Sequence, residues 1–350
     1  MNFRIMRLRT RAGWLPALGL AAVSACSEPA APPTEQVTPG DAEVTGLRAL
    51  AQGVTTPFDG TPDPTGERVI FTTLGTRAEI GEATIQGLGA GNLMITPKSG
   101  GAATMLADGF AAPVQVVSSL DGTKVYVADL AAEQRADDGS SGEGKRGVIY
   151  SVAIPGGGDK IALEGTRGYQ PRGLDVAKID GKEWLYFVGR DPADGVFGVF
   201  RTENGTSVEM VKKGAPLLMP SCLAVAANGD IYLTDLGGEE RAGAVLKLSG
   251  DSAEVLVGQL NLGTPAGLAL SESEKVLLVS ALRPANEGGT SVVQRIELAT
   301  VTVAAFDDGI KTNFDSAGLH RAHNADLFAW SNAGQTGTVF LVGTKKNPLP

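Results

Sequence analysis

One short pattern returns six times along this chain and constrains its fold more than any other feature. Each copy has a proline or serine, an apolar run, a polar turn, a second apolar run and a closing polar residue; PVQVVSSLDGTKVYVADL (113–130) and PSCLAVAANGDIYLTDL (220–236) are two of them. The copies begin at Pro57, Pro113, Pro171, Pro220, Pro265 and Ser316. Spacings of 45 to 58 residues predict one four-stranded blade of a β-propeller per copy.

Each repeat divides into two predicted hairpins. The turns Asp121-Gly122, Asp180-Gly181 and Asn228-Gly229 are typical of two-residue hairpin loops, because these residues tolerate positive φ. A second pair of apolar runs follows after a variable loop, for example in segments 147–166, 195–214 and 243–260. The abundance of glycine, 47 residues, and the low aromatic content of 5% also favour many short strands over long helices.

The two ends of the repeat region complement each other. The last copy ends in GTVFLVGTKKNPLP and has no fourth strand, whereas VTGLRALAQGV (44–54) precedes the first copy and belongs to none. This N-terminal segment resembles the fourth-strand segment ATMLADGF (103–110). We therefore expect an all-β, six-bladed propeller over residues 44–346, closed by an N-terminal strand that completes the last blade and so removes two exposed sheet edges.

The N-terminal segment predicts that the protein is exported from the cytoplasm. Residues 1–25 combine four arginines with an apolar run and small residues, as a secretory signal peptide does. VSAC (23–26) resembles the bacterial lipobox, which implies cleavage before Cys26 and lipidation of that cysteine; an ordinary signal peptide with a chance cysteine is the alternative. Ser27, in place of Asp, implies the outer membrane. Residues 26–43, rich in Pro, Ala, Thr and acids, predict a disordered tether.

The net charge and the cysteine content limit which binding partners and which disulfide bonds are expected. The net charge of −9 argues against nucleic acid, because phosphate binding needs clustered Lys and Arg. We expect a monomer that meets the membrane of the cell envelope only through its lipid anchor. Cys222 has no disulfide partner once Cys26 is acylated, and we expect it to be a small buried residue rather than a nucleophile.

The segments with the pattern P-x-G-L-A followed by N-G-x-I-Y-L-T-D resemble NHL-repeat and gluconolactonase-like propellers over about residues 44–343. The resemblance implies the fold more strongly than any activity. Lactonases of that class hold a divalent metal at the axis with Glu, Asn and Asp, just after the proline position. Those positions hold no acid or amide here, but Phe58, Val114, Arg172, Ser221, Ala266 and Ala317. Asp59 and Gln115 each lie one residue after these positions, and Asp175 lies three residues after Arg172. Strand alternation predicts that Asp59 and Gln115 face away from the axis.

Other candidate residues favour structural roles. The only histidines, His320 and His323, are three apart and so would face opposite ways on a strand, and the repeat register places His323 near the turn; both points argue against a shared metal ion or a catalytic role. Asp129 and Asp235 end second strands, where we expect them to bind backbone N–H groups of the next loop, with a polar ring at one rim as the alternative. No catalytic residue, metal ligand or cofactor is assigned.

The remaining candidate is the face with the loops that join second to third strands and successive blades, called the loop face below. It carries charges of both signs, and the residues taken as candidate ligand contacts are Arg172, Ser221, Arg190, Asp191, Arg241 and Arg283. The sequence thus favours an envelope-anchored binding scaffold that recognises a small molecule or an envelope protein there. A metal-dependent lactone or ester hydrolase with atypical ligands is the alternative.

Overall fold

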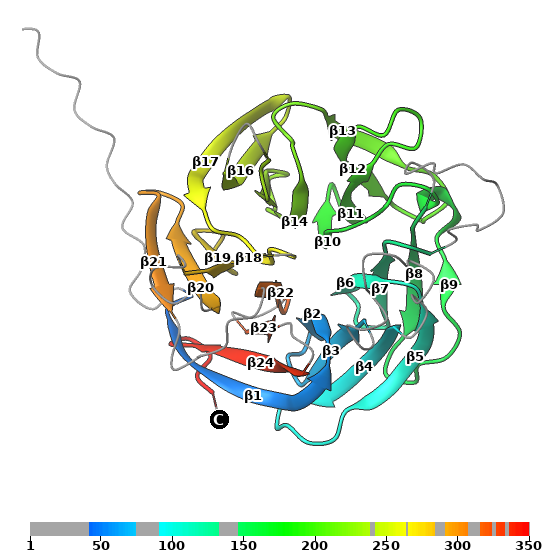
Figure 1. The fold of residues 1–350 in the computed structure, drawn as a ribbon, viewed down its shortest axis with the longest axis vertical. Coiled ribbons are helices and arrows are strands. Elements are labelled where there is room, and N and C mark those ends of the chain that lie inside the picture. Colours follow the sequence, from blue (N-terminus) through cyan, green and yellow to red (C-terminus); the bar gives the residue numbers. More distant parts are fainter. Residues whose placement is uncertain are drawn as a thin grey trace, which may run out of the picture. The chain divides into compact units, whose positions relative to one another are not determined.

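A computed structural model describes residues 42–74, 91–132, 146–238, 242–263, 265–283, 291–306, 316–323, 327–332 and 336–349. These residues belong to one compact unit, 35–350. They form six antiparallel four-stranded sheets, arranged as the blades of a propeller (Figure 1). The predicted fold is therefore confirmed. In the described ranges, no helix is both long enough and apolar enough to cross a membrane. The signal peptide, Cys26 and most of the tether lie outside these residues.

Each of the first five blades follows chain order from the axis outward. The strands of blades 1 to 3 are β2 (Pro57–Pro62), β3 (Arg68–Thr73), β4 (Gly91–Pro97), β5 (Thr104–Phe110), β6 (Pro113–Ser118), β7 (Lys124–Asp129), β8 (Val148–Ala153), β9 (Ile161–Ala162), β10 (Leu174–Ile179), β11 (Lys182–Arg190), β12 (Phe197–Thr202) and β13 (Glu209–Lys213). A short 3₁₀ helix, Glu164–Thr166, follows β9.

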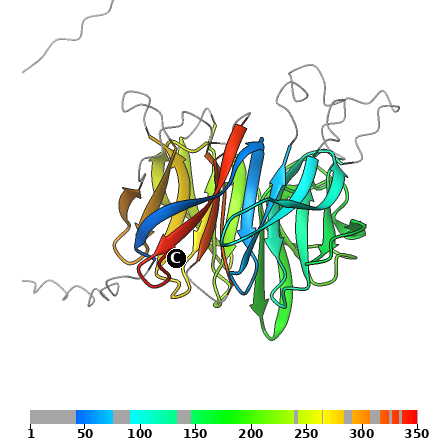
Figure 2. The same ribbon diagram turned by 90° about the horizontal axis from the view of Figure 1, so that it is seen from below.

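Blade 6 differs because its outermost strand comes from the N-terminus. The strands of blades 4 to 6 are β14 (Pro220–Val225), β15 (Ile231–Asp235), β16 (Gly243–Ser249), β17 (Ser252–Leu260), β18 (Leu268–Leu270), β19 (Val276–Leu282), β20 (Ser291–Glu297), β21 (Thr302–Phe306), β22 (Ser316–Arg321), β23 (Phe328–Asn332), β24 (Thr336–Thr344) and β1 (Val44–Thr55). Strand β1 pairs antiparallel with β24 from Val44↔Thr344 to Thr55↔Thr336. Figure 2 shows the two strands crossing the edge of the ring together. The predicted closure is confirmed.

The three dipeptides lie in hairpin turns as predicted, but only Asp180-Gly181 forms a two-residue loop, between the paired residues Ile179 and Lys182; the other two loops are longer, since their last strand pairs are Ser118↔Val125 and Val225↔Ile231. Gly122, Gly181 and Gly229 have φ of 69°, 80° and 86°, values that glycine adopts without a steric cost. These turns lie at the ends of the first strands, so together they define a second face of the propeller, called the hairpin face below.

The hydrophobic core lies between neighbouring blades. Phe187 and Phe200 of blade 3 pack with Ile149 of blade 2 in one cluster, and Leu233 of blade 4 packs with Val199 of blade 3 in the next. Because each blade packs both of its faces in this way, second strands such as β7 and β15 are buried almost throughout. This packing fixes the inner strands, and therefore the residues at the axis.

Candidate functional site

The axis is filled by the third residue of the repeat in the three blades where that residue is not glycine. In blades 1, 2 and 4 these residues are Asp59, Gln115 and Cys222, and all three are fully buried. The Cys222 thiol lies 3.5 Å from the Gln115 side-chain oxygen, a contact between blades 2 and 4. These side chains form a plug, which we call the axial plug.

The prediction that Asp59 and Gln115 face away from the axis is wrong, and a β-bulge is the reason. The strand registers are irregular between Pro57 and Asp59 and between Pro113 and Gln115. A bulge places two residues of one strand opposite a single residue of its partner, so the simple alternation slips by one. Phe58 and Val114 consequently pack into the cluster between blades instead.

Polar side chains of the inner strands connect successive blades. Asp59 Oδ2 accepts a hydrogen bond from Val116 N at 2.7 Å, which joins blade 1 to blade 2. Gln115 Oε1 accepts from Leu174 N at 2.9 Å, which joins blade 2 to blade 3.

Asp175 makes the next connection in this series. Its Oδ2 accepts from Val225 N at 2.7 Å and its Oδ1 from Val176 N at 2.9 Å, so it joins blade 3 to blade 4. Part of the polar character of the axis is therefore structural.

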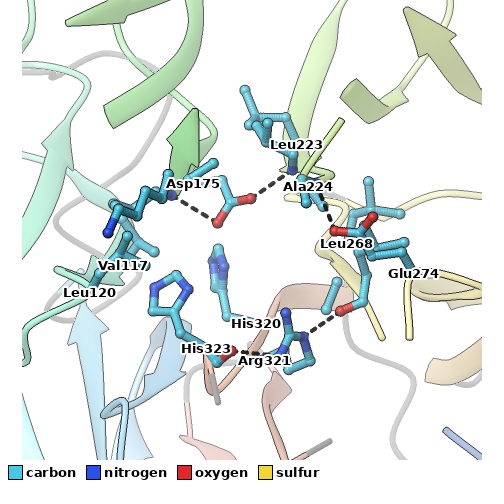
Figure 3. Close-up of a pocket in the computed structure, with 17 residues that line it drawn as sticks. Val117, Leu120, Asp175, Leu223, Ala224, Leu268, Glu274, His320, Arg321 and His323 are labelled. Atoms are coloured by element: carbon cyan, nitrogen blue, oxygen red, sulfur yellow. Dashed lines mark hydrogen bonds between the residues drawn. The ribbon is translucent and has the colours of Figure 1, made fainter. Parts of the chain in front are cut away.

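A cavity of about 220 Å³ opens beside the plug, towards the hairpin face. Its wall includes the fifth residue from the repeat start in five of the blades, and residues of the hairpin turns complete it. Figure 3 shows this axial cavity. Its lining residues include Val117, Asp175, Lys178, Ala224, Ala269, Glu274, His320, Arg321 and His323.

His320 is held in the wall by the plug. Its Nε2 lies 2.9 Å from Asp59 Oδ2, and both side chains are almost fully buried. Burial lowers the pKa of His320, but the charge and hydrogen bond of Asp59 outweigh burial, so the pKa is raised overall. The imidazolium form is thus favoured while Asp59 balances its charge.

His323 reaches the same cavity from beyond the end of β22. Its Nε2 lies 3.0 Å from the carbonyl oxygen of Ser118 in blade 2. Burial lowers the pKa of His323, although Asp175 acts in the opposite direction. Burial also raises the pKa of Asp175. His323 therefore favours its neutral form, in which Nε2 donates to the Ser118 carbonyl and Nδ1 is left as a hydrogen-bond acceptor.

The expectation that the two histidines face opposite ways is wrong. Strand β22 ends at Arg321, so strand alternation does not extend to His323. Arg321 fixes the turn: its Nε donates to Leu270 O at 2.6 Å, and its Nη1 donates to Ala322 O and His323 O. The two imidazoles lie beside one another below Asp175 in Figure 3.

The candidate ligand residues predicted on the loop face do not form one site. Arg172 and Arg190 come together over the ring of Phe197, with their Cζ atoms 4.9 and 3.9 Å from its centroid. Asp191 does not pair with Arg190 but binds Lys213 at 2.6 Å. Arg172 therefore points at a residue of the third strand and not into the axis, where the sequence analysis placed it.

Ser221 is buried, and its Oγ accepts a hydrogen bond from Ala266 N at 3.0 Å, so it joins blade 4 to blade 5. Arg283 is described, and its carbonyl oxygen accepts from the Asn261 side chain. Arg241 and Cys26 lie outside the described residues.

The two strand-end aspartates bind backbone N–H groups of loops as expected, but chiefly in the loop that precedes the first strand of their blade and not in the next loop. Asp129 accepts hydrogen bonds from Ala111 N and Ala112 N at 2.8 and 2.7 Å. Asp235 accepts from Leu218 N, Met219 N and Gly237 N. Cys222 is buried as expected, and burial raises the pKa of its thiol to about 12, so it does not ionise at neutral pH.

The described residues form no group suited to a metal ion. Within them, no three or more His, Cys, Asp or Glu side chains are grouped so that they could hold a metal ion. His320 and His323 share the cavity with Asp175, but the Asp175 oxygens bind backbone N–H groups and His320 Nε2 faces Asp59. The cavity thus presents hydrogen-bonding groups beside aliphatic side chains.

No protein-family profile matches the chain, and no curated protein matches its sequence. Solved structures share the fold. A glucose dehydrogenase is 13% identical with a TM-score of 0.59, covering 85% of this chain and 99% of its own. A protein described as a candidate gluconolactonase is 14% identical with a TM-score of 0.57, covering 87% and 98%. An auxiliary nutrient binding protein from Bacteroides thetaiotaomicron is 11% identical with a TM-score of 0.53, covering 84% and 70%. At these identities the likeness concerns the propeller fold alone.

Proposed function

We propose that this propeller is a binding protein that holds a small molecule in the axial cavity. The observation that carries the proposal is that the chain has only two histidines, and both line this one cavity next to Asp175. Asp59 binds one nitrogen of His320 and the Ser118 carbonyl binds one nitrogen of His323, so each imidazole keeps its other ring nitrogen for a ligand. A concave site with a few convergent polar groups on an apolar wall is the usual form of a ligand site.

The lining favours a neutral ligand with several hydroxyl groups. The acids Asp175 and Glu274 are balanced by the bases Lys178 and Arg321, so the wall has no excess formal charge to attract an ion. Asp175 and His323 provide hydrogen-bond partners for hydroxyl groups, and Val117 and Ala269 provide apolar contact for the carbon skeleton. Sugars, polyols and their lactones have this chemistry; one protein with the same fold is named for acting on glucose.

A screen of neutral monosaccharides, polyols and sugar lactones tests this proposal. We expect at least one of them to raise the Tm of the wild-type protein, because a ligand that binds only the folded state stabilises it. His323→Gln keeps a donor for Ser118 O but loses the imidazole, so it should reduce the Tm shift. Lys182→Gln, an exposed hairpin-face change outside the cavity, should leave the shift intact. A panel that gives no shift, or an equal shift in both variants, would refute the cavity as the binding site.

We further propose that the propeller is tied to the bacterial outer membrane by lipid on Cys26. The support is the signal-like segment 1–25 with VSAC at its end, followed by a segment rich in proline and acids. Two or three acyl chains at one end give a stable anchor, whereas a single chain is marginal. Cell fractionation tests the anchor: the wild type should sediment with membranes and Cys26→Ser should not. Equal distribution of the two would contradict it.

A hydrolase of lactones or esters is the second candidate, and the buried Asp59–His320 pair is the observation that favours it. An imidazole oriented by a carboxylate at a cavity wall is an arrangement used for proton transfer. The same panel distinguishes the two functions, because turnover of a lactone that is lost in His320→Gln would indicate catalysis. Binding without turnover would support the binding function alone.

A further inference from the structure

Three arginines gather on the loop face, on the opposite side of the axial plug from the cavity. Arg172 and Arg190 both lie over the ring of Phe197, as described above. Arg146, just before β8, is close enough to act on Arg172 electrostatically. We call these three residues, together with Gln170, the arginine cluster.

The backbone holds the cluster in place. Gln170 N donates to Arg146 O at 3.0 Å, and Arg172 N donates to Val188 O at 2.9 Å. Arg190 N donates to Tyr169 O at 2.6 Å. The four residues therefore belong to one framework built from the start of β8, the loop before β10 and the end of β11, which holds the backbones of the three arginines close together.

The buried donors of the cluster lack acceptors. Arg146 Nε, Arg172 Nε and Gln170 Nε2 are buried and make no hydrogen bond, and the Gln170 side chain is only 2% exposed. No carboxylate of the described ranges forms an ion pair with these guanidinium groups, and Asp191, next in sequence to Arg190, is bound by Lys213. Burial, followed by the charges of Arg190 and Arg146, lowers the pKa of Arg172 to about 10. Unpaired buried donors and neighbouring like charges both reduce stability.

We propose that the arginine cluster binds a small oxyanion with at least two negative charges, supplied by a phosphate group or by two carboxylates. Such an anion would accept hydrogen bonds from the unpaired Arg146, Arg172 and Gln170 donors and would cancel the repulsion among the arginines. Guanidinium groups suit this task because their planar N–H groups match the spacing of phosphate and carboxylate oxygens. The site is distinct from the axial cavity, because the fully buried plug residues Asp59, Gln115 and Cys222 lie between them.

Thermal unfolding with two probe anions, inorganic phosphate and citrate, tests the proposal at ionic strength matched with sodium chloride. We expect at least one anion to raise the Tm of the wild type by about 2 °C or more, and to raise that of Arg172→Met much less. Without the anion, Arg172→Met should melt at or above the wild-type temperature, because it removes a like charge and an unpaired donor. Arg146→Met is a second variant, expected to behave similarly if Arg172→Met folds poorly.

Arg201→Met is the matched control. Arg201 also lies over an aromatic ring, that of Trp184 at 4.2 Å, but it is paired with Glu209. This variant should respond to the anions as the wild type does. A response to phosphate alone would indicate a phosphate group, and a response to citrate alone would indicate paired carboxylates. Equal stabilisation of the wild type and both cluster variants would overturn the proposal, since phosphate and citrate stabilise folded proteins generally; so would the absence of any shift.

Discussion

Gly318 shows how tightly single residues determine the axis. A Cβ atom at this position would lie 1.3 Å from Asp59 Oδ1, so the carboxylate occupies the space that any side chain would need. Gly173 and Gly267 stand at the same place in blades 3 and 5, where a Cβ would meet the backbone of the next blade at 2.5 and 2.1 Å. The glycine of the P-x-G-L-A pattern therefore allows close contact of inner strands and leaves room for the plug.

We expect Gly318→Ala to destabilise the protein by about 3 to 5 kcal/mol, the range for disrupting a buried charged pair, because Asp59 would have to leave His320 and Val116 N. Gly156→Ala is the matched control, since nothing lies within 4 Å of its added Cβ, and it should change stability by less than about 0.5 kcal/mol. Urea unfolding measures both variants. If both lose equal stability, the steric role of Gly318 is wrong.

The residue directly after each repeat proline was expected to face the axis, but in three blades the residue that does so is the next one along the chain. Bulges after Pro57, Pro113 and Pro220 move the inward-facing position to the next residue. A bulge depends on how two strands pair, and no residue type in the first strand marks it here. Likewise, the position of His323 depends on where β22 ends, which the contacts of Arg321 determine. The histidine cavity could not be predicted for these reasons.

At the scale of elements, β1 joins the ends of the ring. Leu50 and Ala51 are buried in a cluster with Val339 and Leu341 of β24 and with Phe71 of blade 1. The strand thus completes blade 6 and covers the junction with blade 1. This closure was predictable because the last repeat lacks a strand and the first is preceded by an extra one.

Two truncations test the closure. Deleting residues 27–41 should leave the Tm nearly unchanged, and it stops before Ala42, which is buried with Trp330. Deleting residues 27–54 removes most of β1, so we expect the Tm to fall by about 10 °C or more, because two blades then expose apolar surface and an unpaired edge. Equal melting temperatures for the two chains would contradict the closure.

At the scale of the whole molecule, the propeller presents two different faces. The hairpin face opens to a cavity without excess charge, whereas the loop face carries the arginine cluster. The repeat spacing and the Asp-Gly and Asn-Gly turns were sufficient to predict six blades. The sequence favoured the loop face as the binding site because long loops can be recognised in a sequence. A cavity between short inner strands, by contrast, forms only when all six blades are assembled.

The most direct test of the binding function is a set of calorimetric titrations that compares a variant of the axial cavity with a variant of the loop face. The ligand is the neutral sugar, polyol or lactone that stabilises the wild type most, titrated into wild type, His323→Gln and Arg172→Met. We predict that His323→Gln weakens binding about tenfold or more, equivalent to a loss of about 1.4 kcal/mol, while Arg172→Met binds as tightly as the wild type. Unchanged affinity in His323→Gln, or weakened affinity only in Arg172→Met, would contradict the assignment of the ligand to the axial cavity.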